Sequence, residues 1–221
     1  MGNKLSSDFN FYEAALVKRT QLFKDCINIV VGDGKLDADI MFVGEAPGRN
    51  EDETGVPFCG AAGKNLDNLL EKVGLKRSDI YIANILKCRP PQNRDPQSDE
   101  IKAHTPWLLK QIKEIKPKVV CSLGNYATKF FIAKGDVENM DKQPGITSLH
   151  GRPREIEMGD LKFKLIPLFH PAAIIYNRTK LTPLWEEDME VVKKEIFGEE
   201  SEKSDEVIEE KKEVGPQKRL F

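Results

Sequence analysis

Carboxylates and one aromatic ring are concentrated in a glycine- and proline-rich segment, Gly44–Gly63 (GEAPGRNEDETGVPFCGAAG). Glu45 and Glu51 are its candidate chemical groups, because a carboxylate can orient a water molecule or stabilise a developing positive charge. Phe58 lies in a Gly-Pro turn rather than in a periodic apolar run. A loop this long inside a compact domain is usually functional. The alternative is a solvated loop whose carboxylates lie on the surface.

Two further polar side chains stand near the ends of apolar runs that are typical of strands. Asn84 interrupts IYIANI, and His170 directly follows LIPLF. An Asn side chain offers a carbonyl and an amide, which can pair with the edge of a pyrimidine base. A His in this position is well placed for a site. The alternatives are an Asn that caps its own loop and a His that makes a structural hydrogen bond.

Two basic segments follow these runs: KCRPPQNRDP, residues 87–96, and YNRTK, residues 176–180. Positive side chains in such segments can contact phosphates. Both segments could equally be ordinary polar loops. The candidate phosphate contacts are Lys87, Arg89, Arg94, Arg178 and Lys180.

Short apolar runs rich in β-branched residues must position these groups. Continuous apolar runs of this kind favour strands of a parallel sheet covered on both faces. Amphipathic stretches lie between them, at residues 63–73 and 98–115. This alternation predicts a three-layer α/β/α sandwich around a central, mainly parallel four-stranded sheet. The expected strands are Ile40–Gly44, Ile80–Ile85, Val119–Leu123 and Leu165–Phe169. Ligands of such sheets bind beyond the carboxyl ends of the strands, where the polar groups described above stand.

Charge is unevenly spread along the 221 residues. The whole chain has a formal net charge of −2, whereas residues 1–197 hold 28 acidic and 29 basic residues. We therefore expect one domain over residues 1–197 and a charged, disordered tail over residues 198–221. The sequence has no apolar run long enough to span a membrane and no signal-peptide core. We expect a cytoplasmic monomer with four reduced cysteines.

Taken in order, the strings GEAPG, EDETGVPFCG, NILKCRPPQNRDP and FHPA resemble the family 4 uracil-DNA glycosylases over residues 30–197. The resemblance implies a prokaryotic, nucleoid-associated repair enzyme. Such an enzyme flips deoxyuridine from single- or double-stranded DNA into a pocket and hydrolyses its N-glycosidic bond. It releases uracil and leaves an abasic site. Two alternatives stay open: an inactive DNA-binding relative, and a glycosylase that acts on hypoxanthine or xanthine.

The resemblance also assigns roles to individual residues. Phe58 corresponds to the aromatic that stacks on uracil, and Asn84 to the residue that hydrogen-bonds the uracil edge. His170 corresponds to the histidine that stabilises negative charge on the leaving base. Glu45 and Glu51 correspond to the two carboxylates of the first motif.

The first motif does not decide which carboxylate orients the water molecule. Gly44 and Ala46 belong to the expected uracil pocket, and Ala46 stands where the best-known glycosylase branch carries Asp. Glu51 is favoured for the water, with Glu45 shaping the pocket. The segment after His170 corresponds to an intercalation loop, whose candidate wedges are Ile174, Ile175 and Tyr176.

Family 4 enzymes usually carry a 4Fe-4S cluster held by four cysteines. The corresponding positions here are Val17, Thr20, Cys88 and His104. Such clusters need four soft ligands, normally thiolates. We therefore expect no cluster and no metal site.

The last six residues, PQKRLF, are similar to a shortened sliding-clamp binding motif. In that reading Gln217 would enter a polar pocket, while Leu220 and Phe221 would fill an apolar one. The alternative is an unstructured end with two isolated apolar residues.

Overall fold

The computed structural model describes residues 21–198. Its centre is a six-stranded sheet with the order β1-β3-β2-β4-β6-β5. The four inner strands run parallel to one another, and both edge strands are antiparallel to their neighbours. The strands are β1 (Asp33–Gly34), β2 (Ile40–Gly44), β3 (Tyr81–Asn84), β4 (Val119–Leu123), β5 (Arg154–Met158) and β6 (Leu161–Leu168).

The predicted α/β fold is confirmed, and so are its four parallel strands. The prediction of only four strands is wrong, because two short edge strands extend the sheet. β1 has two residues, too few for a hydrophobic pattern. In β5 only Ile156 and Met158 are buried, since an edge strand with one covered face needs few apolar residues.

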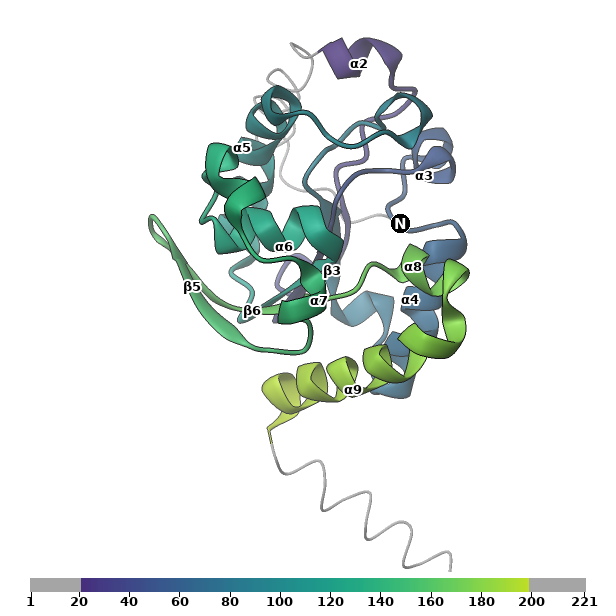
Figure 1. Cartoon of the computed structure of the whole chain (residues 1–221), viewed down its shortest axis with the longest axis vertical. Coiled ribbons are helices and arrows are strands. Elements are labelled where there is room, and N and C mark those ends of the chain that lie inside the picture. The colour runs from purple at the N-terminus through teal and green to yellow at the C-terminus, as the bar shows by residue number, and fades with distance from the viewer. Residues whose placement is uncertain (1–20, 199–221) are drawn as a thin grey trace, which may run out of the picture.

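Helices cover both faces of this sheet (Figure 1). On one face α5 and α6 bury Trp107, Leu108 and Phe130 against the strands, and on the other α4 and α9 bury Leu66 and Trp185. The helices are α2 (Gln21–Asp25), α3 (Arg49–Thr54), α4 (Ala61–Lys72), α5 (Ser98–Ile115), α6 (Gly124–Ile132), α7 (Ile146–Leu149), α8 (Pro171–Tyr176) and α9 (Arg178–Phe197), with short 3-10 turns η1 (Arg77–Asp79), η2 (Pro91–Asn93) and η3 (Val137–Lys142).

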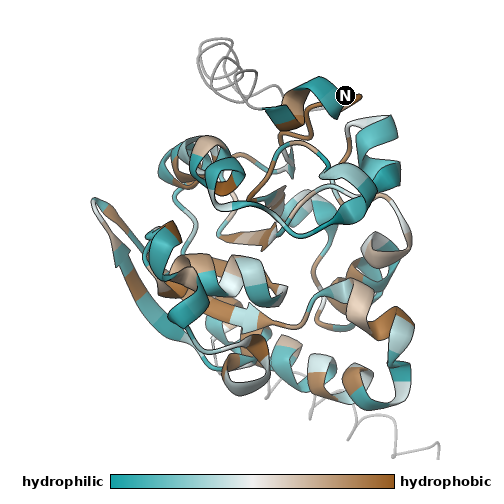
Figure 2. Cartoon of the chain, turned by 45° about the horizontal axis from the view of Figure 1, so that its top comes forward, coloured by the Kyte–Doolittle hydropathy of each residue, from teal (hydrophilic) through white to brown (hydrophobic). Residues whose placement is uncertain are grey.

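Adjacent residues of one strand serve the two different cores. In β2, Met41 and Val43 join the α5–α6 core, whereas Ile40 and Phe42 join the α4–α9 core. Figure 2 shows hydrophobic stretches in the central strands and helices that alternate between hydrophilic and hydrophobic residues. A strand buried on both faces needs apolar residues throughout, which explains the continuous run IMFVG.

The parallel strands all end at one edge of the sheet. Glu45 follows β2, Asn84 is the last residue of β3, and His170 comes two residues after β6. Long connections leave this edge and form the surface around it (Figure 1). None of the helices within residues 21–198 is long and apolar enough to cross a membrane.

Candidate active site

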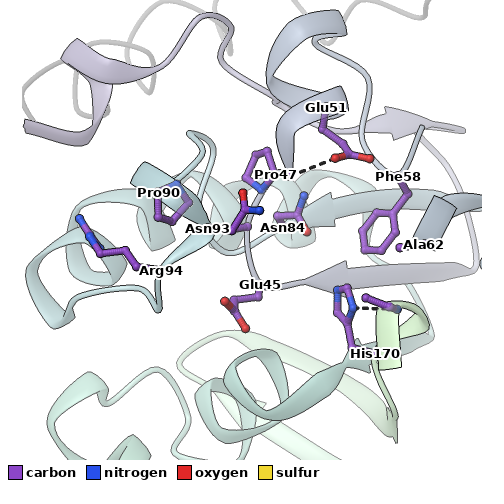
Figure 3. Close-up of a pocket in the computed structure, with 13 residues that line it drawn as sticks. Glu45, Pro47, Glu51, Phe58, Ala62, Asn84, Pro90, Asn93, Arg94 and His170 are labelled. Atoms are coloured by element: carbon purple, nitrogen blue, oxygen red, sulfur yellow. Dashed lines mark hydrogen bonds between the residues drawn. The ribbon is translucent and has the colours of Figure 1, made fainter. Parts of the chain in front are cut away.

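A cavity of about 240 Å³ opens at this edge of the sheet. It brings together the predicted Glu45, Glu51, Phe58, Asn84 and His170, which come from three separate segments (Figure 3). Ala46 also lines it, as predicted. The remaining lining residues are Pro47, Gly48, Ala62, Pro90, Asn93, Arg94 and Ala172. Apolar walls with a few convergent polar groups are typical of a small-molecule or base pocket.

Phe58 forms one wall of the cavity. Its backbone has a φ of +52°, a left-handed conformation that a bulky residue rarely adopts. Its ring is 5.8 Å from the His170 ring, with 34° between the planes. A Cβ at Gly44 would lie 2.7 Å from Cζ of Phe58. Gly44 therefore belongs to the site by leaving room for this ring, although it does not line the cavity.

Asn84 presents an unpaired acceptor to the cavity. The side chain is 1% exposed, and its Oδ1 has no hydrogen-bond partner among the described residues. A buried polar atom without a partner is costly, so such atoms point to a ligand or a water molecule. A Cβ at Gly44 would lie 2.3 Å from this Oδ1, which is a second reason for glycine at position 44.

His170 is a neutral hydrogen-bond donor. It is the N-cap residue of α8, and its Nδ1 accepts from the backbone N–H of Ala172 at 3.2 Å. The ring proton therefore sits on Nε2. Burial lowers the pKa of His170 to about 4, and the opposing attraction of Glu51 is the weaker effect. The imidazole thus stays neutral at physiological pH.

Glu51 is held by backbone hydrogen bonds. Oε2 accepts from the N–H of Gly48 and Oε1 from the N–H of Gly60, each at 3.0 Å. The first bond satisfies the backbone N–H of Gly48, the N-cap residue of α3. The Cys59 thiol donates to the same Oε1 at 3.7 Å. The carboxylate is consequently fixed in position, and both of its oxygens already accept hydrogen bonds from the protein.

Glu45 is in a different electrostatic situation. Burial and, secondarily, the charge of Asp95 raise the pKa of Glu45 to about 7. Its carboxyl group accepts no hydrogen bond from any residue between 21 and 198. An acid with a pKa near neutrality can exchange a proton at physiological pH.

The prediction that Lys87 contacts DNA is wrong, because its side chain is completely buried. Nζ donates to the backbone oxygen of Asn84 and to Oε1 of Gln111, each at 2.7 Å. Burial lowers the pKa of Lys87 to about 7. A neutral amine still has the two hydrogens that these bonds require. Lys87 therefore stabilises the end of β3 by linking the Asn84 backbone to Gln111 of α5.

The other basic residues lie near the surface. Arg94 at the cavity rim donates to both carboxylate oxygens of Glu100, at 2.9 and 2.6 Å. Arg89 is half-buried, and its Nε donates to Oδ1 of Asn93 at 2.7 Å. Arg178 and Lys180 are exposed at the start of α9. Arg178 and Lys180 are therefore accessible to phosphates, whereas Arg94 is already paired with a carboxylate.

The candidate wedges differ in exposure. Ile174 is buried against the α4–α9 core, so the prediction that it intercalates is wrong. Ile175 is 51% exposed and Tyr176 is 88% exposed at the end of α8. Side chains on a short helix point in different directions, and the sequence alone did not distinguish the inward one.

Asn93 was not among the predicted site residues. It lines the cavity, and its amide orientation is set by the bond from Arg89. Gln92 and Asn93 both have a positive φ, at 55° and 54°. Consecutive left-handed residues are uncommon and concentrate at functional sites. The sequence signal that could have pointed to Asn93 is the turn-forming string PPQNRDP. This string indicates a tight turn, but it does not show which side chains of the turn face the cavity.

The residues at the cluster positions do not match a four-thiolate set. Cys88 is buried beside Cys26, and its pKa is raised first by a hydrogen bond with that thiol. Nδ1 of His104 accepts from the backbone N–H of Lys87 at 2.9 Å. Residues 21–198 contain no group of three potential metal ligands. Val17 and Thr20 lie outside the described residues.

Comparison with known proteins agrees with this geometry. Residues 31–190 match the Uracil DNA glycosylase superfamily, to which the chain therefore belongs. Within it the chain falls in the type-4 branch. It is 42% identical to the type-4 uracil-DNA glycosylase of Archaeoglobus fulgidus, over 79% of this chain and 85% of that protein. It is 44% identical to the type-4 enzyme of Thermotoga maritima, over 75% and 82%. A type-5 enzyme of Pyrobaculum aerophilum is 30% identical over 58% of this chain.

Proposed function

We propose that this protein hydrolyses the N-glycosidic bond of deoxyuridine in DNA, releasing uracil and leaving an abasic site. The observation that carries the proposal is the convergence of an unpaired Asn84 oxygen, the Phe58 ring and a neutral His170 in one cavity. The membership of the type-4 branch supports the same activity.

Recognition of uracil follows from the acceptor at Asn84. Uracil carries a hydrogen on N3, whereas cytosine presents a lone pair there. The unpaired Oδ1 of Asn84 can accept from the former and would repel the latter. Phe58 offers an apolar ring on which a planar base can stack. A site built to hydrogen-bond one group strongly rejects an analogue that lacks it.

His170 would stabilise the leaving group. When the bond between C1′ and N1 breaks, its electron pair stays on uracil and positive charge grows on the sugar. The Nε2–H of a neutral imidazole is a preorganised donor for the resulting oxyanion. Because the pKa of His170 is about 4, this donor is available throughout the neutral pH range.

For the water molecule we propose Glu45 rather than the Glu51 favoured by the sequence. A carboxylate near the sugar stabilises the positive charge there. As the water oxygen bonds to C1′, the same carboxylate takes up a proton from that water. The pKa of Glu45, about 7, suits that proton transfer. Glu51 already accepts two backbone hydrogen bonds, which suits a role in shaping the loop.

The DNA backbone and the gap left by the flipped base require surface groups. We propose that Tyr176 fills the gap, with Ile175 beside it, since both side chains are exposed at the end of α8. Arg178 and Lys180 follow in the chain, Arg94 lines the cavity, and Arg89 lies on the same loop as Arg94. These four cations would contact phosphates.

The test uses oligonucleotides with a single uracil in single-stranded, G:U and A:U contexts. Alkali cleaves abasic sites, so strand breaks report base release. We expect breaks in uracil substrates and a loss of about a hundredfold or more in N84A, since its recognition group is removed. Breaks only in hypoxanthine or xanthine substrates would show a shifted specificity. Binding without breaks in any substrate would indicate an inactive relative.

We propose that the protein works without an iron-sulfur cluster. The four cysteines do not converge on one site: Cys59 is in the cavity loop, Cys121 is in β4, and only Cys26 and Cys88 are neighbours. Purified protein without iron, and without absorbance typical of a cluster, would support this. Stoichiometric iron in active protein would overturn it.

We propose a cytoplasmic, nucleoid-associated monomer that binds a sliding clamp through Pro216–Phe221, with Gln217, Leu220 and Phe221 as the contacts. These residues lie outside those that the structure describes, and the sequence motif alone supports the proposal. Clamp binding with and without the last six residues tests the contact. Light scattering tests the monomer.

A further inference from the structure

Arg77 reaches the cavity wall from outside it. It begins η1, the turn before β3, and belongs to none of the motifs that form the cavity. Its Nη1 donates to the backbone oxygen of Pro57 at 3.1 Å, and its Nη2 donates to the backbone oxygen of Phe58. Its Nε donates to Oδ1 of Asp67 in α4 at 2.5 Å. One guanidinium therefore joins the aromatic wall to a rigid helix.

Phe58 requires such support because its backbone is left-handed. A bulky residue leaves that conformation unless its surroundings fix it. Behind it, a Cβ at Gly63 would lie only 1.6 Å from the Phe58 oxygen and 3.1 Å from Nη2 of Arg77. The carbonyl of Phe58 is thus held between the backbone of α4 and the guanidinium.

Arginine suits this task through its planar fork of five N–H donors. The three bonds use three different nitrogen atoms, each directed to its own acceptor. A lysine ammonium is a compact point charge and cannot reproduce this planar arrangement. The guanidinium is only partly exposed, at 30%, so water competes weakly for its donors.

We infer that Arg77 is a positioning residue that holds the Phe58 ring at the angle required for stacking on the base. The inference rests on the proposed function, because it assumes that a planar base occupies the cavity. Arg77 would thus contribute to the affinity for the base through Phe58, without touching the base itself. Contacts between the protein and the DNA backbone would not depend on Arg77.

The test compares R77Q with wild-type full-length protein. The measured quantities are kcat/KM on uracil DNA, the inhibition constant of free uracil, and affinity for abasic DNA. We expect kcat/KM to fall about ten- to a hundredfold, as for a small misplacement of a binding group. Uracil inhibition should weaken about three- to tenfold, the value of an aromatic contact. Affinity for abasic DNA should stay unchanged, which distinguishes positioning from general loss of structure.

A double-mutant cycle tests whether Arg77 acts through Phe58. If it does, R77Q adds little to the loss already present in F58L, because the ring it holds is gone. The matched control is K72Q: Lys72 is another cation bonded to a neighbouring element, through Glu186 on α9, away from the cavity. K72Q should leave all three quantities at wild-type values.

Unchanged uracil inhibition in a folded R77Q, or losses of R77Q and F58L that simply multiply, would overturn the inference. If R77Q does not fold, R77K and D67N replace it. Each should show a smaller weakening of uracil inhibition, and wild-type values in both would equally overturn it. Failure of the proposed function is a separate result: wild-type protein would then release no uracil, whereas calorimetry of uracil binding to R77Q still tests Arg77.

Discussion

The pKa of Glu45 makes the pH dependence of the reaction a quantitative prediction. Burial raises this pKa to about 7, and the negative charge of Asp95 adds to the effect. If the ionised form of Glu45 handles the water, kcat/KM must rise with pH. With a pKa of about 7, the ionised fraction is roughly 9% at pH 6 and roughly 91% at pH 8. Activity should therefore increase about tenfold between these values.

The sign of this effect is specific to Glu45. His170, with a pKa of about 4, is neutral at both pH values and contributes no change. Lys87 is also a candidate, since its pKa is about 7, but its ionised form disappears as pH rises and its two hydrogen bonds persist. Single-turnover rates at protein concentrations below saturation, measured from pH 5 to pH 9 at constant ionic strength, report kcat/KM and therefore the titration of the DNA-free protein.

Two variants make the assignment refutable. E45Q should be slow at every pH and should lose the rise between pH 6 and 8. D95N should move the rise to lower pH, because it removes the neighbouring negative charge. E51D, a matched carboxylate control, should keep the rise at its original pH. A rise that persists in E45Q would refute the role of Glu45 in the water step.

Four other predictions concern single contacts. G44A should reduce kcat/KM about a hundredfold or more, because its Cβ would overlap Oδ1 of Asn84 and Cζ of Phe58; a wild-type rate would contradict the packing. K87M should lower the free energy of unfolding in urea by about 1–3 kcal/mol, since it leaves two buried acceptors unpaired. Y176A should weaken excision from duplex DNA more than from single strands, and equal effects would argue against a wedge. E51Q should slow excision without moving its pH dependence, as expected if it holds the loop.

The inner sheet was predictable because strands buried on both faces need continuous apolar runs. The runs around Phe42, Ile82, Val120 and Ile166 each gave a strand where expected. The edge strands were not predictable, because β1 is held by pairing with β3 rather than by its own hydrophobic pattern. Pairing between distant segments leaves little local signal.

The site was predictable to the extent that motifs stand at strand ends. Glu45, Asn84 and His170 meet because parallel strands end at one edge. The direction of a loop side chain was not predictable. Lys87 turns inward to two buried acceptors, which a basic, proline-rich string does not indicate. Arg77 lies far from Phe58 in sequence, so its role depends on the folded loop.

The most direct test of the central claim measures the product itself. Protein in excess is incubated with a duplex that carries one uracil opposite guanine, and free uracil is measured by mass spectrometry. We predict one uracil released per duplex, with an equal number of abasic sites, and no cytosine released from the matched G:C duplex. Release of no uracil by folded wild-type protein that binds the duplex would contradict it.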